Sequence, residues 1–262
     1  MKSLNLKILS SILIFYLLTF TSCVFKTTKN KSNNNCSKSD TNLDIANPIN
    51  VGKLDDRTCK HVYSEDNIDG EIWGKYEVSE NSSTDGVNSA RMERIFEREK
   101  PTDGSYQYFS GICRIESVSD GKRGTYIIQA KGKHIGHVNV DPAICLVGAK
   151  KRTKNGDTYF ELYSEQITKR GGRLSKGTRQ IIKLATVKKN EPFKLEMKTG
   201  FKGNPIHQHY VSIKINDKEH WMDVPEPQIG IETGIRYGAY SVEEGKAIVF
   251  FKDTKFESST KP

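Results

Sequence analysis

Three short segments of the sequence combine charged, amide and phenolic side chains at a spacing of two or four residues. In an extended strand, residues at this spacing lie on the same face of the sheet. Each segment can therefore direct a pair of polar side chains to one side. The pairs are Arg91 with Glu93, Gln129 with Lys131, and Arg236 with Tyr240.

Such a set of groups suits the cleavage of a uronate polymer by β-elimination. The sugar carboxylate must be neutralised so that the C5 proton becomes acidic, a base must remove that proton, and an acid must protonate the leaving glycosidic oxygen. Gln and Arg side chains can hydrogen-bond the carboxylate and favour the developing enolate. A Tyr phenol can serve as acid or base when cations lower its pKa, and a Lys amine can act as base when its pKa is depressed.

Other residues near these pairs are open to two interpretations. His134 and His137 follow the second pair closely and are alternative candidates for the base, although a structural role is the commoner one. Tyr237 adjoins the third pair but lies on the opposite face of its strand, where packing in a core is the competing interpretation. Strict alternation also places Ile127 on the polar face of its segment and Tyr126 on the opposite, apolar face.

The elements that must position these residues are predicted to be β-strands. Between residues 55 and 257 almost no helical periodicity occurs, and short β-runs alternate with turn signals. Asn155-Gly156 is a strong hairpin signal, and Asn216-Asp217 is a weaker one. About a dozen strands without interleaved helices predict an all-β fold. We expect a β-jelly roll sandwich of two antiparallel sheets with a concave ligand-binding face.

The three segments resemble the alginate-lyase branch of the concanavalin-like jelly-roll polysaccharide lyases. That group carries an Arg-x-Glu-x-Arg strand, a Gln-Ile-His strand and a Tyr-Phe-Lys-Ala-Gly-x-Tyr strand near the C-terminus. The counterparts here, within a resemblance over about residues 70–257, are in order Arg91-Met-Glu93-Arg-Ile95, Gln129-Ala-Lys131 and Ile235-Arg236-Tyr-Gly238-Ala-Tyr240. The motifs are only partly kept, and two departures matter: Lys131 stands where the family has His, and Ile95 stands where it has the second Arg.

The resemblance implies a jelly roll and a lyase acting on alginate first, or on glucuronan or another polyuronate. It implies Arg91 and Gln129 as the groups that neutralise the carboxylate, and Tyr240 as the catalytic tyrosine. Lys131 points to a related branch in which Lys is the base paired with Tyr. We expect Lys131, Tyr240, Gln129 and Arg91 to be catalytic, and Glu93, Arg236, Tyr237, His134 and His137 to bind substrate.

Two other functions fit the same fold. The two replaced residues also suit a non-catalytic protein that binds acidic glycan without releasing an unsaturated product. A glycoside hydrolase would need two carboxylates ~5–10 Å apart on the concave face, and Glu93 stands alone in the signature strands. β-Elimination requires no metal or organic cofactor, and no Cys/His spacing typical of a metal site occurs.

The N-terminus predicts export. Lys2 and Lys7 precede an apolar run over residues 8–20, which is shorter than the ~20 residues of a spanning helix and typical of a signal peptide. The run ends in Phe-Thr-Ser-Cys, which resembles a bacterial lipobox with Cys23 as the lipidated residue; ordinary secretion is the alternative. We expect a signal peptide at 1–22, a flexible tether at 23–54 and the lyase domain at 55–262. The protein would be a cell-envelope lipoprotein (outer membrane or periplasm) or secreted.

The charge restricts the class of partner. The chain has 41 Lys and Arg against 32 Asp and Glu, a net charge of +9, which becomes +7 without residues 1–22 because these hold two lysines and no acids. The basic runs Lys150-Lys-Arg152 and Lys169-Arg170 could steer a polyanion. Nucleic acid suits the charge too, but no recognition-helix, aromatic RNA-binding or zinc-finger pattern occurs. We expect an acidic polysaccharide and a lipid anchor as partners of a monomer.

Four cysteines remain after export: Cys36, Cys59, Cys113 and Cys145. An exported protein can form disulfides, and four thiols allow three pairings, among which the sequence does not choose. Cys113 and Cys145 lie in predicted strands and could instead be buried small apolar residues.

Overall fold

A computed structural model of the chain shows an all-β protein in the residues that it describes. These are residues 46, 53–55, 62–79, 90–100, 102–134, 143–168, 179–203, 208–225, 231–243 and 245–259. Within these ranges every regular element is a β-strand. The same ranges contain no helix with the length and apolar character needed to cross a membrane.

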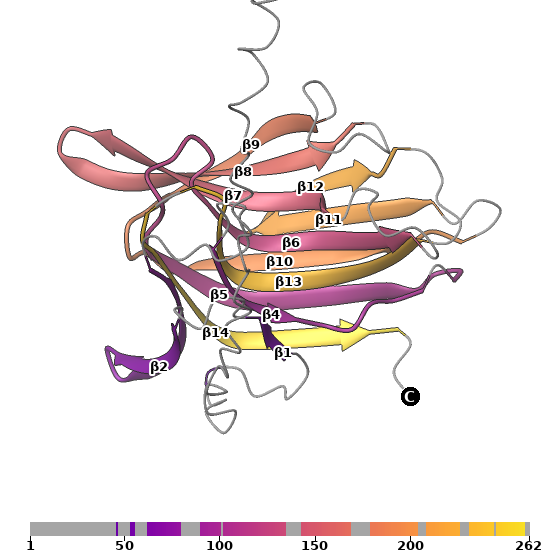
Figure 1. Cartoon of the computed structure of the whole chain (residues 1–262), viewed down its shortest axis with the longest axis horizontal. Helices are drawn as coiled ribbons and strands as arrows, with labels where there is room; N and C mark the ends of the chain where they lie inside the picture. Colours follow the sequence, from indigo (N-terminus) through magenta and orange to yellow (C-terminus); the bar gives the residue numbers. More distant parts are fainter. Residues whose placement is uncertain are drawn as a thin grey trace, which may run out of the picture. The chain divides into compact units, whose positions relative to one another are not determined.

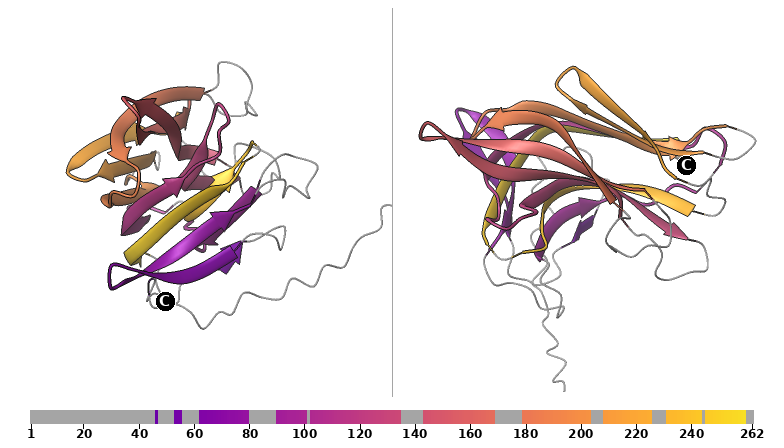
Figure 2. Two further views of the ribbon diagram at one scale, coloured as in Figure 1. Left: turned by 90° about the vertical axis from the view of Figure 1, so that its left-hand side faces the viewer. Right: turned by 90° about the horizontal axis from the view of Figure 1, so that it is seen from above.

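The described strands form two antiparallel sheets of seven strands, sheet A and sheet B (Figure 1). Sheet A has the spatial order β1 (Lys53–Asp55), β4 (Ala90–Ile95), β13 (Ile231–Ser241), β6 (Thr125–His134), β7 (Ala143–Lys154), β8 (Asp157–Ile167) and β9 (Arg179–Lys188). Sheet B has the order β12 (Lys218–Asp223), β11 (His209–Ile215), β10 (Phe193–Phe201), β5 (Tyr106–Ser117), β14 (Ala247–Ser258), β3 (Glu71–Val78) and β2 (Val62–Ile68). Figure 2 shows the sheets as two twisted layers. The predicted sandwich of two antiparallel sheets is confirmed.

Alternating side chains give each strand one apolar face for the core. In β10, Phe193, Leu195 and Met197 are buried, whereas the residues between them are exposed or half-buried. The apolar faces of both sheets meet in one cluster of buried residues. Burial of this kind contributes about 1.5–3 kcal/mol for each large apolar side chain and holds the two layers together.

Tyr237 of β13 lies in the middle of this core. It is 1% exposed, and its ring centroid is 4.4 Å from that of Phe109, 5.0 Å from Phe251 and 5.6 Å from Tyr76, all three in sheet B. Burial raises the pKa of its phenol well above the ordinary value. The prediction that Tyr237 binds substrate is therefore wrong, because β13 turns it toward the core when it turns Arg236 to the other face.

A β-bulge changes the faces of β6. Opposite β7, Ile127 is an extra residue between Tyr126 and Ile128. Ile127 and Ile128 both lie fully buried in the core, whereas Tyr126 packs with Tyr240 outside it. The assignment of Ile127 to the face of Gln129, and of Tyr126 to the apolar face, is therefore wrong, because a bulge shifts the alternation by one residue.

Both predicted hairpin turns are confirmed. Asn155 and Gly156 have φ angles of 52° and 86°, as a type I′ turn requires, and Asn216 has a φ of 52° between β11 and β12. The β7–β8 hairpin extends beyond its neighbours, at the left of Figure 1. The arm of this hairpin formed by β7 carries the basic run at residues 150–152 near its exposed end.

The N-terminal boundary of the sheets lies earlier than predicted. Strand β1 begins at Lys53 and so crosses the predicted end of the tether at residue 54. Ala46, also within the predicted tether, is buried and donates its backbone N–H to Glu65 Oε1 at 3.0 Å. The predicted signal peptide, Cys23 and, apart from Ala46, the other residues before 53 lie outside the described part of the chain.

Two of the four cysteines that follow residue 23 are described. Cys113 and Cys145 are free and buried. Burial raises the pKa of the Cys145 thiol to about 12, so it stays protonated and packs as a small apolar side chain. Cys36 and Cys59 lie outside the described residues.

Gly238 of β13 allows a close approach of β4. Its φ is +136°, and a Cβ there would clash with the carbonyl oxygen of Met92 and lie 2.9 Å from Glu93 Cα. We expect Gly238→Ala to lower the free energy of unfolding by about 3 kcal/mol, because backbone strain and steric overlap add. Thermal or urea unfolding measures the change.

The matched control is Gly203→Ala, since nothing lies within 4 Å of a Cβ at that position. Its effect should stay within about 0.5 kcal/mol. Equal stability of the two variants would contradict the close approach at Gly238.

Candidate active site

Strands β4, β13 and β6 are neighbours in sheet A and bring the three sequence segments into register. The cross-strand pairs are Tyr240 with Arg91, Gly238 with Glu93, and Arg236 with Gln129. Adjacent strands lie about 4.8 Å apart, so long side chains on the same face of neighbouring strands meet. The face concerned is the one opposite the core, because Tyr237 and Ala239 between these residues are buried in the core.

Glu93 is the centre of the cluster. Its side chain is 1% exposed, and Gln129 Nε2 donates a hydrogen bond to its Oε1. Its Oε2 lies 3.7 Å from Arg91 Nη1 and 3.9 Å from Arg236 Nη1. A carboxylate removed from water is costly unless it is paired and hydrogen-bonded. The two guanidinium groups and the amide supply these partners.

A second carboxylate, Asp55 of β1, joins the same cluster. Its Oδ2 lies 2.9 Å from Arg236 Nη1 and 3.9 Å from Arg91 Nη1, and β1 pairs it with Glu93. Two arginines are therefore balanced by two acids. Sequence reasoning missed Asp55 because a strand of three residues, Lys-Leu-Asp, is too short to show alternation.

Tyr240 lies between this charged cluster and an aromatic one. The guanidinium carbon of Arg91 is 4.3 Å from the centroid of the Tyr240 ring, and the centroid of the Tyr126 ring is 5.6 Å from it. A cation against an aromatic face is worth about 0.5–2 kcal/mol and fixes the ring. Its half-buried side chain is thus held at the border of the two clusters.

The aromatic cluster consists of Tyr126, Leu146 and Tyr163, with Tyr240 packed against it. Tyr126 donates a hydrogen bond to Glu165 Oε2 at 2.6 Å. Burial raises the phenol pKa of both Tyr126 and Tyr163 far above the ordinary value, so both stay protonated at neutral pH. These two tyrosines therefore form an aromatic wall of the site and do not act as acid–base groups. The sequence could not predict the position of Tyr126 on this face, because the bulge in β6 gives no sequence signal.

Lys131 lies on the same face at one end of the cluster. It is half-buried, two residues from Gln129 on β6, and pairs with Gly234 of β13. Gly234 precedes Tyr240 by six positions in β13, which is about 20 Å along an extended strand. The contacts thus join Gln129, Glu93, Arg91, Arg236 and Tyr240 in one cluster, with Lys131 farther along the same face.

The predicted histidines lie beyond what the structure describes. His134 ends β6, but its side chain is outside the described set, and His137 is outside it entirely. Their roles stay predictions. Among the described residues, no group of three or more His, Cys, Asp or Glu side chains could hold a metal ion.

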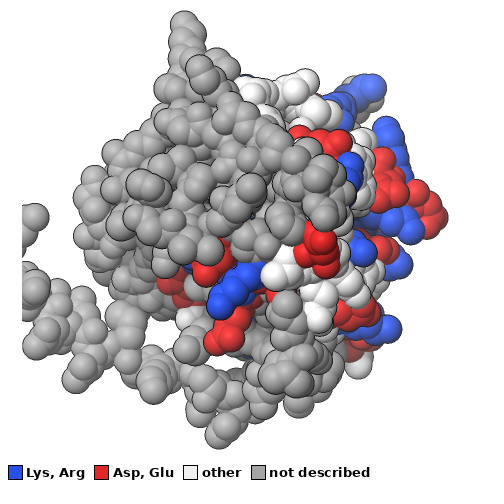
Figure 3. Space-filling view, turned by 90° about the vertical axis from the view of Figure 1, so that its right-hand side faces the viewer, with Lys and Arg blue, Asp and Glu red and all other residues white. Residues whose placement is uncertain are grey.

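On one face of the molecule, charges of both signs are mixed among the described residues. In the face drawn in Figure 3, Lys and Arg side chains lie among Asp and Glu side chains. A mixed surface of this kind provides no continuous positive track. Where a polyanion binds is therefore set by local groups of cations more than by the net charge.

We expect Glu93→Gln to lower the free energy of unfolding by about 3 kcal/mol, because it leaves Arg91 and Arg236 with less negative charge in a buried position. Thermal unfolding of the variant measures the loss. The control is Glu161→Gln, since Glu161 also lies between two cations, Arg152 at 3.3 Å and Lys183 at 3.4 Å, but is 25% exposed. Its loss should stay below about 1 kcal/mol; equal losses would argue against the buried network.

Curated relatives share much of this sequence. An endo-acting ulvan lyase of Formosa agariphila is 38% identical over 231 residues, and an ulvan lyase of Nonlabens ulvanivorans is 38% identical over 234 residues. Each match covers 82% of this chain and 44% of the relative. The chain therefore spans less than half the length of these curated relatives.

Solved structures share the fold. An alginate lyase from Pseudomonas aeruginosa aligns with a TM-score of 0.57 at 13% identity, over 74% of this chain and 86% of its own. A marine PL7 alginate lyase from Zobellia galactanivorans aligns with a TM-score of 0.56 at 14% identity, over 76% and 83%. These likenesses confirm the predicted jelly-roll fold of the polysaccharide lyases.

The sequence also matches a family as a whole. The match runs over residues 21–260 and so includes every strand described above. Together with the relatives at 38% identity, it shows that this chain belongs to the PL28 ulvan lyases.

Proposed function

We propose that this chain is a polysaccharide lyase that cleaves ulvan by β-elimination next to a uronate residue. The observation that carries the proposal is the cluster of Arg91, Glu93, Gln129, Arg236 and Tyr240 on one face of sheet A, in a member of the PL28 ulvan lyases. Ulvan replaces alginate as the first substrate, because both curated relatives are named ulvan lyases and the likeness to alginate lyases supports the fold alone.

Arg91 is the main candidate for binding the uronate carboxylate. Its Nε and Nη1 are buried donors without a hydrogen-bond partner among the described residues. A buried donor of this kind costs free energy until an acceptor arrives, and a carboxylate offers two acceptor oxygens in a geometry that suits a guanidinium. Gln129 would donate its remaining amide hydrogen beside Arg91, so that negative charge on the enolate is stabilised.

Lys131 and Tyr240 are the proposed proton-transfer groups. They lie on the same face of sheet A, at either end of the carboxylate-binding residues, so their long side chains can approach one sugar from opposite ends. A base removes the C5 proton, the electron pair forms the C4–C5 double bond, the C4–O bond breaks, and an acid protonates the departing oxygen.

Glu93 and Asp55 act as positioning residues in this proposal. The carboxylate of each accepts a hydrogen bond from a side chain that would otherwise be available to substrate. Each carboxylate also lies within 4 Å of both Arg91 and Arg236. They fix the two guanidinium groups before substrate arrives, which lowers the ordering cost of binding.

We also propose that the protein acts outside the cytoplasm, as a lipoprotein anchored through Cys23 or in a secreted form. The charged and apolar N-terminal residues and the small residues before Cys23 support this. An envelope or secreted location suits an enzyme whose substrate is a polymer.

We expect Tyr240→Phe and Lys131→Ala each to lower kcat on ulvan by about 10²-fold or more, since each removes a proton-transfer group. Ultraviolet absorbance of the unsaturated product measures the rate, with alginate and glucuronan assayed beside ulvan. Thermal unfolding close to that of the unmodified protein would show that the loss is chemical.

Controls for this experiment are Tyr159→Phe and Lys154→Ala, which remove the same groups from the β7–β8 hairpin, away from the cluster. The kcat of each control variant on ulvan should stay within about twofold of that of the unmodified protein. Absence of unsaturated product from every polyuronate would overturn the lyase proposal and favour the non-catalytic glycan-binding alternative.

A further inference from the structure

A basic pocket lies beside the far end of β7, outside the cluster already described. It has a volume of about 480 Å³. Its lining contains four cations and one carboxylate, which is an unusual excess on a surface of mixed charge. The lining residues are Ser119, Asp120, Gly121, Lys122, Lys150, Lys151, Arg152 and Thr153.

The loop that forms one wall of this pocket is held in place by specific contacts. Ser119 Oγ donates to the carbonyl of Gly124 at 2.6 Å, and the backbone N–H of Arg123 donates to Glu243 Oε2 at 2.9 Å. Gly124 has a φ of +63°, and a Cβ there would lie 3.2 Å from Lys150 Cα. The loop therefore lies directly against β7, and the pocket is a built feature of the fold.

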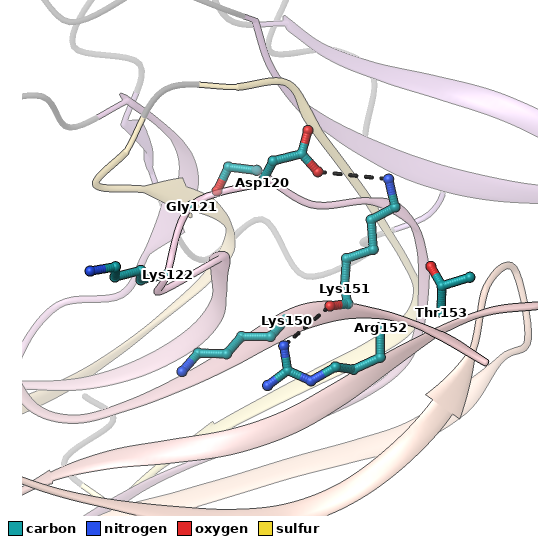
Figure 4. Close-up of a pocket in the computed structure, with 8 residues that line it drawn as sticks. Asp120, Gly121, Lys122, Lys150, Lys151, Arg152 and Thr153 are labelled. Atoms are coloured by element: carbon teal, nitrogen blue, oxygen red, sulfur yellow. Dashed lines mark hydrogen bonds and ion pairs between the residues drawn. The ribbon is translucent and has the colours of Figure 1, made fainter.

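Three of the four cations point to one side of the pocket. In Figure 4, Lys122, Lys150 and Arg152 extend to the left, whereas Lys151 turns the other way, toward Asp120. Lys151 Nζ lies 3.7 Å from Asp120 Oδ1, so the lining carboxylate is engaged by the cation that points away. The side occupied by the other three is left positive.

Neighbouring carboxylates neutralise the positive charge of these three side chains only in part, so positive charge remains to attract a ligand. Arg152 Nη2 is 3.3 Å from Glu161, but that carboxylate also serves Lys183 at 3.4 Å. In the part of the chain that the structure describes, Lys122 and Lys150 have no carboxylate within ion-pair distance. Two unpaired ammonium groups and a shared guanidinium form a site for a fixed negative charge.

A series of aromatic contacts connects this pocket to the candidate active site. Lys150 Nζ lies 4.3 Å from the ring centroid of Tyr163, which is 6.3 Å from Tyr126, which is 5.6 Å from Tyr240. Tyr126 pairs with Gly148, two residues before Lys150 on β7. Two strand spacings and two residues along a strand place Lys150 about 12 Å from Tyr240.

We propose that Lys122, Lys150 and Arg152 form a distal subsite for a fixed anionic group on the polysaccharide, a sulfate ester or a uronate carboxylate. This inference rests on the proposed function, because it takes the bound chain to be an acidic polymer whose cleaved linkage lies at Tyr240. At about 12 Å from Tyr240, the subsite would bind a sugar residue other than the one whose bond is cleaved. A polymer lying across the aromatic wall would therefore reach both sites at once.

A subsite remote from the reacting bond should act on binding in the ground state and the transition state alike. Its loss should therefore raise KM and leave kcat nearly unchanged. Because its charges are largely exposed, its contribution should also fall as salt screens them. A merely structural role of the same lysines would change unfolding and would not depend on substrate length.

The test compares the double variant Lys122→Gln/Lys150→Gln with the control Lys202→Gln/Lys255→Gln. The control removes equal charge from exposed positions in or next to strands of sheet B, whereas the pocket lies beside β7 of sheet A. On native ulvan at low salt, we expect KM of the first variant to rise about fivefold to tenfold, kcat to stay within about twofold, and the control to match the unmodified protein. An oligosaccharide too short to reach the pocket should show no difference between the variants.

Two further arms identify the anion and separate this inference from the proposed function. If the difference between the variants disappears on desulfated ulvan, the ligand is a sulfate ester; if it disappears on carboxyl-reduced ulvan, it is a carboxylate. Retardation in a native gel containing ulvan, measured in a Tyr240→Phe background, tests binding even if no lyase activity exists. Equal KM and equal retardation for the double variant and its control would overturn the subsite.

Discussion

The geometry of the candidate site depends on one buried carboxylate, that of Glu93. Arg91 and Arg236 come from adjacent strands, and without negative charge between them their guanidinium groups would repel one another in a poorly solvated place. Glu93 removes this repulsion, and its other oxygen fixes the amide of Gln129. Three strands that meet only through backbone hydrogen bonds are thus also joined through their side chains.

Backbone irregularities decide which side chains reach this carboxylate. Gly238 lies opposite Glu93, and the lack of a side chain lets β13 approach β4 closely enough for Arg236 to share the carboxylate. The bulge at Ile127 turns Tyr126 outward beside Tyr240. If β6 had no bulge, the same sequence would direct the Tyr126 side chain into the core, and Tyr240 would lose the aromatic ring that packs against it. The site therefore depends on two local departures from strand regularity.

The sequence predicted the parts of this architecture that depend on local pattern. The all-β fold was predicted because short β-runs between turn signals recur along the chain, and every regular element among the described residues is a strand. β2 lies at the edge of sheet B, and its sequence, VYSEDNI, gives only a weak strand signal because it has few apolar residues. The bulge was missed because one extra residue leaves no local signal, and Asp55 because its partners lie far away in the chain. The facing of Arg91, Glu93, Gln129 and Arg236 was predicted correctly, since parity alone decides it.

The distribution of charge along this face suits a lyase that must release its product. At the centre, two arginines are offset by two carboxylates, so a uronate meets oriented donors without a large excess of positive charge. A strongly positive centre would hold the product as tightly as the substrate and slow turnover. Excess cations are found instead at the far end of β7, where in the proposed subsite they would bind a long polymer but not a fragment too short to reach them. Separating the attraction of the polymer from the chemistry would let this protein bind long chains well and short products weakly.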